Sequence, residues 1–139
     1  MSQENVEVRA LVDAVYGALN AEDLDGFLAL VAEDVEFTSK VAEAEGTTFR
    51  GHDGVRAWWE TVRGAFQDPR WEVLDVRGSP ECGVTTFRMT GTLGGVPVAQ
   101  TMWQGVKTRD GKATWWAYFR SKAEALEAVG LSEQPPKNA

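Results

Sequence analysis

The chain has 139 residues, a formal net charge of −7, one cysteine and one histidine. This length fits a single domain, and so few cysteine and histidine residues exclude a disulfide framework and a structural zinc cluster. Residues 1–45 hold eleven acidic residues against two basic ones, which disfavours a nucleic-acid partner. No apolar run approaches bilayer length and no signal peptide begins the chain, so we expect a cytoplasmic protein without a membrane partner.

The N-terminal segment is predicted to form two helices. Apolar residues recur at helical spacing from Val8 to Leu19, and Tyr16 borders this stripe on its interior side. Residues 20–23 end the first helix, and Asp23 provides an N-cap for a second, shorter helix. The chain is therefore expected to begin with a helical hairpin.

A short strand and a third helix are expected next. Residues 35–39 alternate between apolar and polar side chains, as a half-buried strand does. A polar loop over residues 40–48 leads to the third helix, for which Asp53 is the predicted N-cap and Pro69 the predicted end. The apolar stripe of this helix is wide and consists of Val55, Trp58, Trp59, Val62 and Phe66.

The second half of the chain is predicted to be an antiparallel sheet. A strand is expected at residues 71–77, and a meander of long strands at residues 82–120, where Gly94 and Gly95 form a hairpin turn. Helices first and strands afterwards are typical of the α+β class, in which the helices cover one face of a curved sheet.

The chain is predicted to end in a helix and a tail. Ser121 and Glu124 form a capping box, which places a helix from there to Val129. We expect one domain over residues 1–130 and a disordered tail over residues 131–139.

The turn at Gly94 and Gly95 fixes the register of the predicted hairpin, because a two-residue loop pairs the residues that flank it. One face of the hairpin then carries three neighbouring pairs, Met89 with Gln100, Phe87 with Met102, and Thr85 with Gln104. A dry core rarely retains two amides, so this face is expected to line a cavity whose ligand meets a few polar groups. The alternative is that both amides lie at the edge of the sheet.

The predicted cavity is apolar and aromatic. Such walls suit a flat aromatic or polycyclic ligand, and the alternative is a solid core filled by the same side chains. Neither a metal site nor a cofactor is expected. The predicted ligand contacts are Phe37, Ser39, Trp58, Trp59, Phe87, Met89, Gln100, Met102, Gln104, Trp116 and Tyr118.

Four further polar side chains are candidate reactive groups. His52 lies in a turn before the third helix, where the positive helix end disfavours an imidazolium ion. Cys82 has no basic neighbour in sequence that would lower its pKa. Glu43 and Glu45 belong to the polar loop and would serve as an acid or base if that loop covered the cavity, the alternative being a solvated loop.

Three segments resemble the SnoaL-like branch of the nuclear transport factor 2-like family and its ketosteroid isomerase relatives. They are YGALNAEDLDG at residues 16–26, FRGHDGVRAWW at residues 49–59 and WWAYFR at residues 115–120. The resemblance implies a cone-shaped α+β fold. It implies no single reaction, because the fold hosts isomerases, hydrolases, dehydratases, cyclases and non-enzymes.

Residue by residue, the resemblance carries over only in part. Tyr16 stands where ketosteroid isomerases have the tyrosine that donates a hydrogen bond to the oxyanion, so a catalytic role is implied for it. Ser39 stands in place of the aspartate base, and Met102 in place of a second, protonated aspartate. Serine is no carboxylate base and methionine donates no hydrogen bond, so isomerisation by the familiar route is disfavoured. The alternative for Tyr16 is a core phenol bonded to a backbone carbonyl.

The outer face of the sheet is predicted to be a partner surface. It carries Arg88, Trp103, Trp115 and Phe119, and we expect the chain's own helices to leave these residues uncovered. Family members commonly form dimers through this face, so the resemblance implies a homodimer.

Three functions remain open at this point. The first is a cofactor-independent isomerase, cyclase or hydrolase for a polycyclic or aromatic substrate, similar to ketosteroid isomerases or polyketide cyclases but without their usual aspartate base. In it, Tyr16 donates a hydrogen bond to a carbonyl oxygen while Gln100, Gln104 and Ser39 orient the ligand. The alternative is a non-catalytic protein that binds small ligands, or a homodimerisation scaffold with a filled cone.

Overall fold

A computed structural model describes residues 3–39, 48–78 and 81–131, with side chains from Val8 onwards except that of Ser39. The elements are α1 (Gln3–Asn20), α2 (Leu24–Leu28), β1 (Val31–Ser39), β2 (Thr48–Arg50), α3 (Gly51–Ala65), β3 (Phe66–Gly78), β4 (Cys82–Leu93), β5 (Val96–Arg109), β6 (Lys112–Phe119) and α4 (Lys122–Ala128). The predicted α+β order of elements is confirmed.

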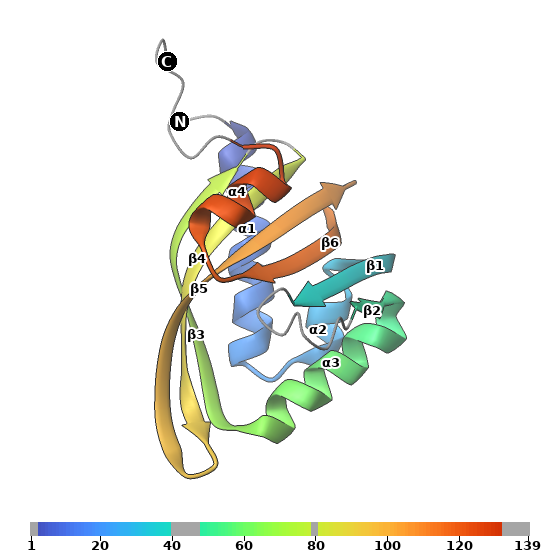
Figure 1. The fold of residues 1–139 in the computed structure, drawn as a ribbon. Coiled ribbons are helices and arrows are strands. Elements are labelled where there is room, and N and C mark those ends of the chain that lie inside the picture. Colours follow the sequence, from blue (N-terminus) through green and yellow to red (C-terminus); the bar gives the residue numbers. More distant parts are fainter. Residues whose placement is uncertain (1–2, 40–47, 79–80, 132–139) are drawn as a thin grey trace.

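The described strands form one curved, open sheet in the order β2-β1-β6-β5-β4-β3 (Figure 1). Neighbouring strands are antiparallel except β1 and β6, which run parallel. The expected curved antiparallel sheet is therefore present, with one parallel pair in it.

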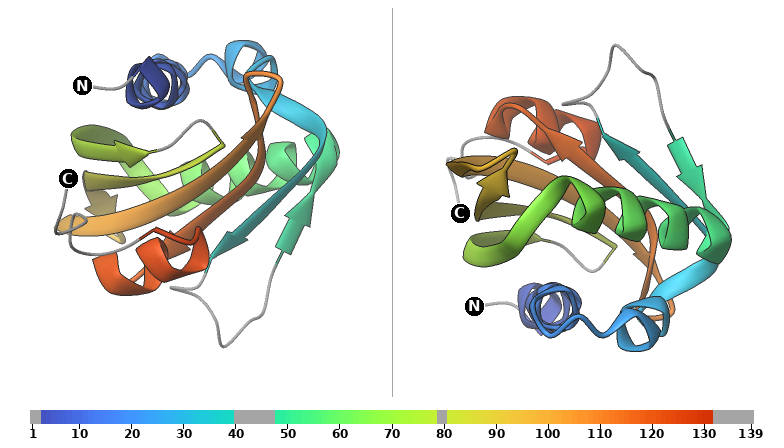
Figure 2. Two further views of the ribbon diagram at one scale, coloured as in Figure 1. Left: turned by 90° about the horizontal axis from the view of Figure 1, so that it is seen from above. Right: turned by 90° about the horizontal axis from the view of Figure 1, so that it is seen from below.

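α1, α2 and α3 lie on the concave side of the sheet, and α4 lies on the convex side (Figure 2). α1 crosses β3, and α3 spans from β1 and β2 towards β3. The predicted apolar stripe of α1 is buried against the sheet, which removes large aliphatic side chains from water at about 1.5–3 kcal/mol each. Its buried members are Val8, Leu11, Val12, Val15, Tyr16 and Leu19.

The predicted register of β4 and β5 is confirmed. Leu93 pairs with Val96 across the turn, and both turn glycines have positive φ, at 59° for Gly94 and 83° for Gly95. Glycine adopts this left-handed backbone without steric cost, as a tight hairpin turn requires. Further along the strands, Met89 pairs with Gln100, Phe87 with Met102, and Thr85 with Gln104.

The predicted start of α3 is wrong. The helix begins at Gly51, and its N-cap is Arg50, which makes no side-chain capping bond. Asp53 lies inside the first turn and accepts from the Arg56 guanidinium at 2.8 Å. A carboxylate in the first turn still interacts favourably with the helix dipole, which explains the acidic residue at this position.

The predicted end of α3 is also wrong, because Pro69 does not follow the helix but lies within β3. The helix ends at Ala65, and β3 continues directly from Phe66. The pairing of β3 with β4 shifts between Gln67 and Arg70, so Pro69 occupies an irregular position of a strand at the edge of the sheet. Both features tolerate a residue without a backbone N–H.

The expectation that the outer face is left open by the chain's own helices is wrong for its aromatic residues. α4 packs on this face and buries Phe119, with Trp103 and Trp115 against the same cluster. Leu131, the one described residue of the predicted tail, also packs there. Arg88 is exposed, so part of the outer face remains accessible.

Candidate functional site

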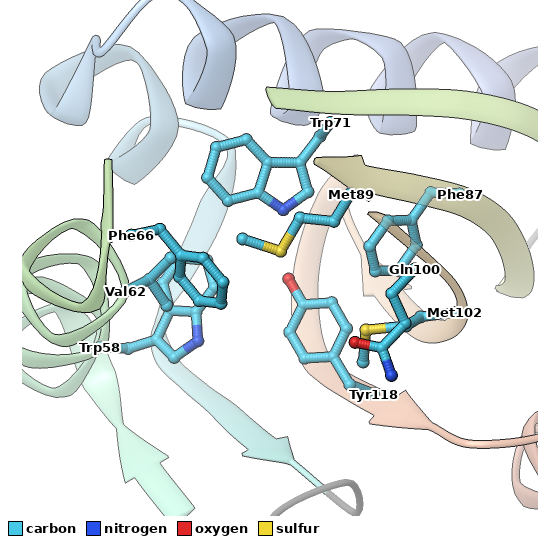
Figure 3. A pocket seen from close by; sticks show the side chains of 9 residues that line it. All are labelled: Trp58, Val62, Phe66, Trp71, Phe87, Met89, Gln100, Met102 and Tyr118. Atoms are coloured by element: carbon cyan, nitrogen blue, oxygen red, sulfur yellow. The ribbon is translucent and has the colours of Figure 1, made fainter. Parts of the chain in front are cut away.

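A cavity of about 220 Å³ lies between α3 and the concave face of the sheet (Figure 3). Its wall is mainly apolar, and the polar side chains in it are the amide of Gln100 and the hydroxyl of Tyr118, together with two indole N–H groups. The lining residues are Trp58, Val62, Phe66, Trp71, Phe87, Met89, Gln100, Met102 and Tyr118.

Local structure explains why these side chains meet. Trp58 and Val62 lie one helical turn apart on α3 and therefore point in the same direction. On the sheet, Met89 is paired with Gln100 on one side and with Trp71 on the other. Paired residues of antiparallel strands place their side chains on the same face, so three strands contribute to one wall.

Arg63 packs against two tryptophans, Trp71 in the cavity wall and Trp59 in the adjacent core. Its guanidinium carbon lies 4.5 Å from the ring centre of Trp59 and 5.8 Å from that of Trp71. It also donates to the backbone carbonyl of Leu19 and pairs with Glu22 at 3.6 Å. Stacking of a guanidinium on indoles is favourable, and here it links α3, β3 and the end of α1.

A buried polar cluster lies behind the cavity. The hydroxyl of Tyr16 donates to Gln104 Oε1 at 3.3 Å, and the indole N–H of Trp116 donates to the Tyr118 hydroxyl at 3.0 Å. The phenols of Tyr16 and Tyr118 are neighbours in this cluster, and each affects the pKa of the other. Among the described side chains, Gln104 Nε2 and Thr85 Oγ1 are buried without a hydrogen-bond partner.

The two tyrosines stay protonated in this setting. Desolvation by burial raises the pKa of Tyr16 well above its ordinary value, and the nearby phenol of Tyr118 raises it further. Desolvation also raises the pKa of Tyr118, although hydrogen bonds from Trp116 and Tyr16 oppose the rise. Both phenols are therefore neutral hydrogen-bonding groups at ordinary pH.

The structure brings part of the predicted ligand-contact set to the cavity. The members that line it are Trp58, Phe87, Met89, Gln100, Met102 and Tyr118. The members that lie in the surrounding core are Phe37, Trp59, Gln104 and Trp116. Tyr16, the predicted catalytic residue, is 2% exposed and lies behind the wall. The side chain of Ser39 and the loop residues Glu43 and Glu45 fall outside the described part, and contact with a ligand stays a prediction for the whole set.

Three lining residues are missing from the predicted set, namely Val62, Phe66 and Trp71. Val62 and Phe66 belong to the apolar stripe recognised from the sequence, so the periodicity of α3 already contained a signal for them. Trp71 depends on the pairing of β3 with β4, whose register shifts twice and could not be counted from a turn.

His52 and Cys82 have structural contacts. His52 Nε2 lies 3.1 Å from the backbone carbonyl oxygen of Val31, which joins the start of α3 to β1. The Cys82 thiol donates to the carbonyl of Val129 at the end of α4. Neither side chain lines the cavity.

The sequence profile of the SnoaL-like domain matches residues 12–124 of the chain. This chain belongs to the SnoaL-like family. The match covers both sides of the cavity, from the stripe of α1 to the first turn of α4.

Several solved structures have the same fold as this SnoaL-like chain. An NTF2-like protein of unknown function from Burkholderia pseudomallei is 24% identical with a TM-score of 0.74, covering 91% of this chain and 97% of that one. TerC, co-crystallised with polyporic acid, is 20% identical with a TM-score of 0.74 and coverage of 92% and 99%. A Mycobacterium tuberculosis protein in complex with estradiol-17β-hemisuccinate is 16% identical with a TM-score of 0.69 and coverage of 84% and 95%. No curated protein matches the sequence significantly.

The chemistry of the SnoaL-like site follows from its lining. None of the described lining residues is an acid or a histidine, so the wall itself supplies shape, aromatic surface and two polar side-chain groups. Over residues 3–39, 48–78 and 81–131, no group of three or more His, Cys, Asp and Glu side chains is placed to hold a metal ion. Across the same ranges, no helix is long and apolar enough to cross a bilayer.

Proposed function

We propose that this SnoaL-like protein binds a compact, flat and apolar molecule in the cavity between α3 and the sheet. The observation that carries the proposal is the composition of the wall, which combines indole, phenyl and thioether groups with two polar side chains. Planar apolar ligands gain both burial and ring stacking against such walls. A volume of about 220 Å³ suits a ligand of two or three fused rings.

Two proteins of the same fold support this class of ligand. The Mycobacterium tuberculosis protein was crystallised in complex with estradiol-17β-hemisuccinate, and TerC was crystallised with polyporic acid. Their low identity to this chain makes the support an analogy at the level of the fold, so the wall remains the main argument.

Binding without catalysis is the form of the proposal that the described residues favour. Acid–base catalysis needs a group whose pKa is close to the working pH and which reaches the ligand. Tyr16 and Tyr118 have raised pKa values and hold their protons. A cofactor-independent isomerase, cyclase or hydrolase would need a base from elsewhere, for which the sequence offers Glu43 and Glu45 outside the described residues.

We further propose a homodimer in which the remaining open part of the outer face is the interface. Arg88 and Thr101 are paired and exposed there, next to the cluster that α4 covers. Sedimentation equilibrium tests this expectation, and a monomer at every concentration would contradict it.

A fluorescence titration with the neutral probe N-phenylnaphthylamine tests the ligand proposal. Val62→Phe adds a ring to the cavity wall, so we expect its affinity for the probe to fall at least tenfold relative to wild type. Val96→Phe is the matched control, because Val96 is 60% exposed at the hairpin turn and does not line the cavity. A wild-type protein without saturable binding, or equal affinities in wild type and Val62→Phe, would contradict the proposal.

A further inference from the structure

We propose that the hydroxyl of Tyr118 donates a hydrogen bond to an oxygen atom of the ligand, so that the cavity selects flat apolar compounds that carry a carbonyl or similar acceptor. This inference rests on the proposed function, because it names the group that recognises the ligand in the same cavity. Tyr118 lines the cavity, and its hydroxyl points into the space that the labelled side chains enclose (Figure 3).

The hydrogen bonds of Tyr118 leave its proton for the cavity. A phenol oxygen accepts two hydrogen bonds and donates one. The indole N–H of Trp116 donates to this oxygen at 3.0 Å, and the phenol of Tyr16 is its second neighbour. In the described part of the chain, the Tyr118 hydroxyl donates to no side chain or carbonyl, and the neighbouring Tyr16 phenol is the group that competes with the cavity for its proton. The direction of the Tyr118 proton therefore depends on which group receives the proton of the neighbouring Tyr16.

Tyr16 has one proton and two candidate acceptors, Gln104 Oε1 and the Tyr118 oxygen. The distance of 3.3 Å to Gln104 is long for a bond between a hydroxyl and an oxygen, for which roughly 2.5–3.0 Å is usual. In that arrangement the amide Nε2 of Gln104 is buried without an acceptor. An orphaned buried N–H group is rarer and more costly than an orphaned carbonyl oxygen.

A half-turn of the Gln104 amide resolves this conflict. The amide nitrogen then faces the Tyr16 oxygen and donates to it, and the carbonyl oxygen takes the position without a partner. Tyr16 is free to donate to Tyr118, and Tyr118 in turn donates into the cavity. Bonds that follow one another in this way polarise each other, which makes the terminal Tyr118 a stronger donor than an isolated phenol.

This arrangement gives the two tyrosines different roles. Tyr16 is a positioning residue, because it lies behind the wall and acts on a ligand only through Tyr118. Tyr118 keeps its proton over the accessible pH range, because burial raises its pKa. A ligand without an acceptor leaves a buried hydroxyl unpaired, and this penalty is the source of the expected selectivity.

A matched pair of probes tests the inference directly. Fluorene and fluorenone share one flat ring system, and only fluorenone carries a carbonyl oxygen. We expect wild type to bind fluorenone roughly 3- to 10-fold more tightly than fluorene in calorimetric titrations. In Tyr118→Phe we expect fluorene to bind more tightly than in wild type, because no buried hydroxyl is left unpaired. The preference for fluorenone should vanish or reverse, because its carbonyl is then buried without a donor.

The infrared carbonyl stretch of bound fluorenone provides a second readout that needs no variant. Hydrogen bonding lowers this frequency below its value in a hydrocarbon solvent, so a lowered frequency in wild type supports the inference. Equal affinity for both probes, or a hydrocarbon-like frequency in wild type, overturns it. Failure of both probes to bind would instead overturn the proposed function, so the two failures are distinguishable. If Tyr118→Phe does not fold, the wild-type frequency alone decides.

Discussion

The side-chain amide of Asn20 binds both backbone groups of Trp71. Its Nδ2 donates to the Trp71 carbonyl at 2.8 Å, and its Oδ1 accepts from the Trp71 N–H at 2.9 Å. The amide thus replaces a neighbouring strand for one residue of β3, which has no strand on its outer side in the sheet order. This contact joins the end of α1 to the strand whose indole lines the cavity.

Replacing Asn20 by alanine is expected to destabilise the protein. The substitution removes two hydrogen bonds and leaves the half-buried backbone of Trp71 without partners, which costs about 2 kcal/mol of unfolding free energy. Urea unfolding measures this loss. Asp13→Ala in the exposed Arg9–Asp13 pair is the control and should change stability by less than about 0.5 kcal/mol. Similar losses in both variants would contradict a special role for Asn20.

Gly105→Ala is expected to destabilise the packing of α4 on the sheet. A Cβ at this buried position would lie 2.9 Å from the Trp115 ring and 3.2 Å from a methyl group of Val129. Overpacking of this kind costs roughly 1–3 kcal/mol, because rigid neighbours must move. Thermal and urea unfolding test the prediction. Wild-type stability in this variant would contradict it and would show that the Trp115 ring moves aside without cost.

Gly17→Ala is expected to stabilise the protein, in contrast to Gly105→Ala. Gly17 lies in α1, and an added Cβ would meet no atom within 4 Å. Alanine loses less conformational entropy than glycine when a helix forms, so unfolding free energy should rise by about 0.5–1 kcal/mol. Both variants replace glycine by alanine and are measured in the same unfolding assay. Gly105→Ala reports on steric overlap of the added Cβ, and Gly17→Ala reports on the lower backbone entropy of the unfolded chain.

Alkaline pH is expected to unfold the protein through its two tyrosines. In the unfolded chain both phenols titrate near pH 10, whereas their pKa values are raised in the folded protein. Above about pH 10 the folded state therefore binds more protons, and unfolding free energy falls by up to about 1.4 kcal/mol per pH unit for each tyrosine. The stabilisation is complete below pH 10 and is lost as the pH rises towards the folded pKa values.

Urea unfolding between about pH 9 and pH 11 measures this slope. The chain has two tyrosines, so tyrosinate absorbance reports on this cluster alone. We expect the absorbance to rise together with unfolding, and Tyr16→Phe to make the stability profile less steep. Tyrosinate formation near pH 10 in protein that is still folded would contradict the burial of both phenols.

The register of β4 and β5 was predictable because Gly94 and Gly95 define a turn with one pairing. The same counting gave the correct neighbours of Gln100 and Gln104. Trp71 was not predictable in this way. The pairing of β3 with β4 shifts between Gln67 and Arg70 and again between Val73 and Asp75, and these irregularities follow from packing rather than from a local motif.

The positions of α4 and of the two tyrosines could not be predicted from the sequence, because they depend on how separate elements pack together. The periodicity of α4 predicts an apolar side, but the direction in which the helix leaves β6 decides that this side covers Trp115 and Phe119. In the same way, a stripe on α1 predicts that Tyr16 is interior, yet only the packed structure shows that Tyr118 lines the cavity and Tyr16 does not.

The parallel pair of β1 and β6 has a consequence for how the protein matures during synthesis. β1 obtains its inner neighbour from residues 113–118, close to the end of the chain. Until those residues leave the ribosome, the apolar side of α1 and the tryptophans of α3 have only part of their sheet to cover them. Contacts between such distant segments slow folding. We therefore expect nascent chains that end before β6 to be the species most dependent on chaperones.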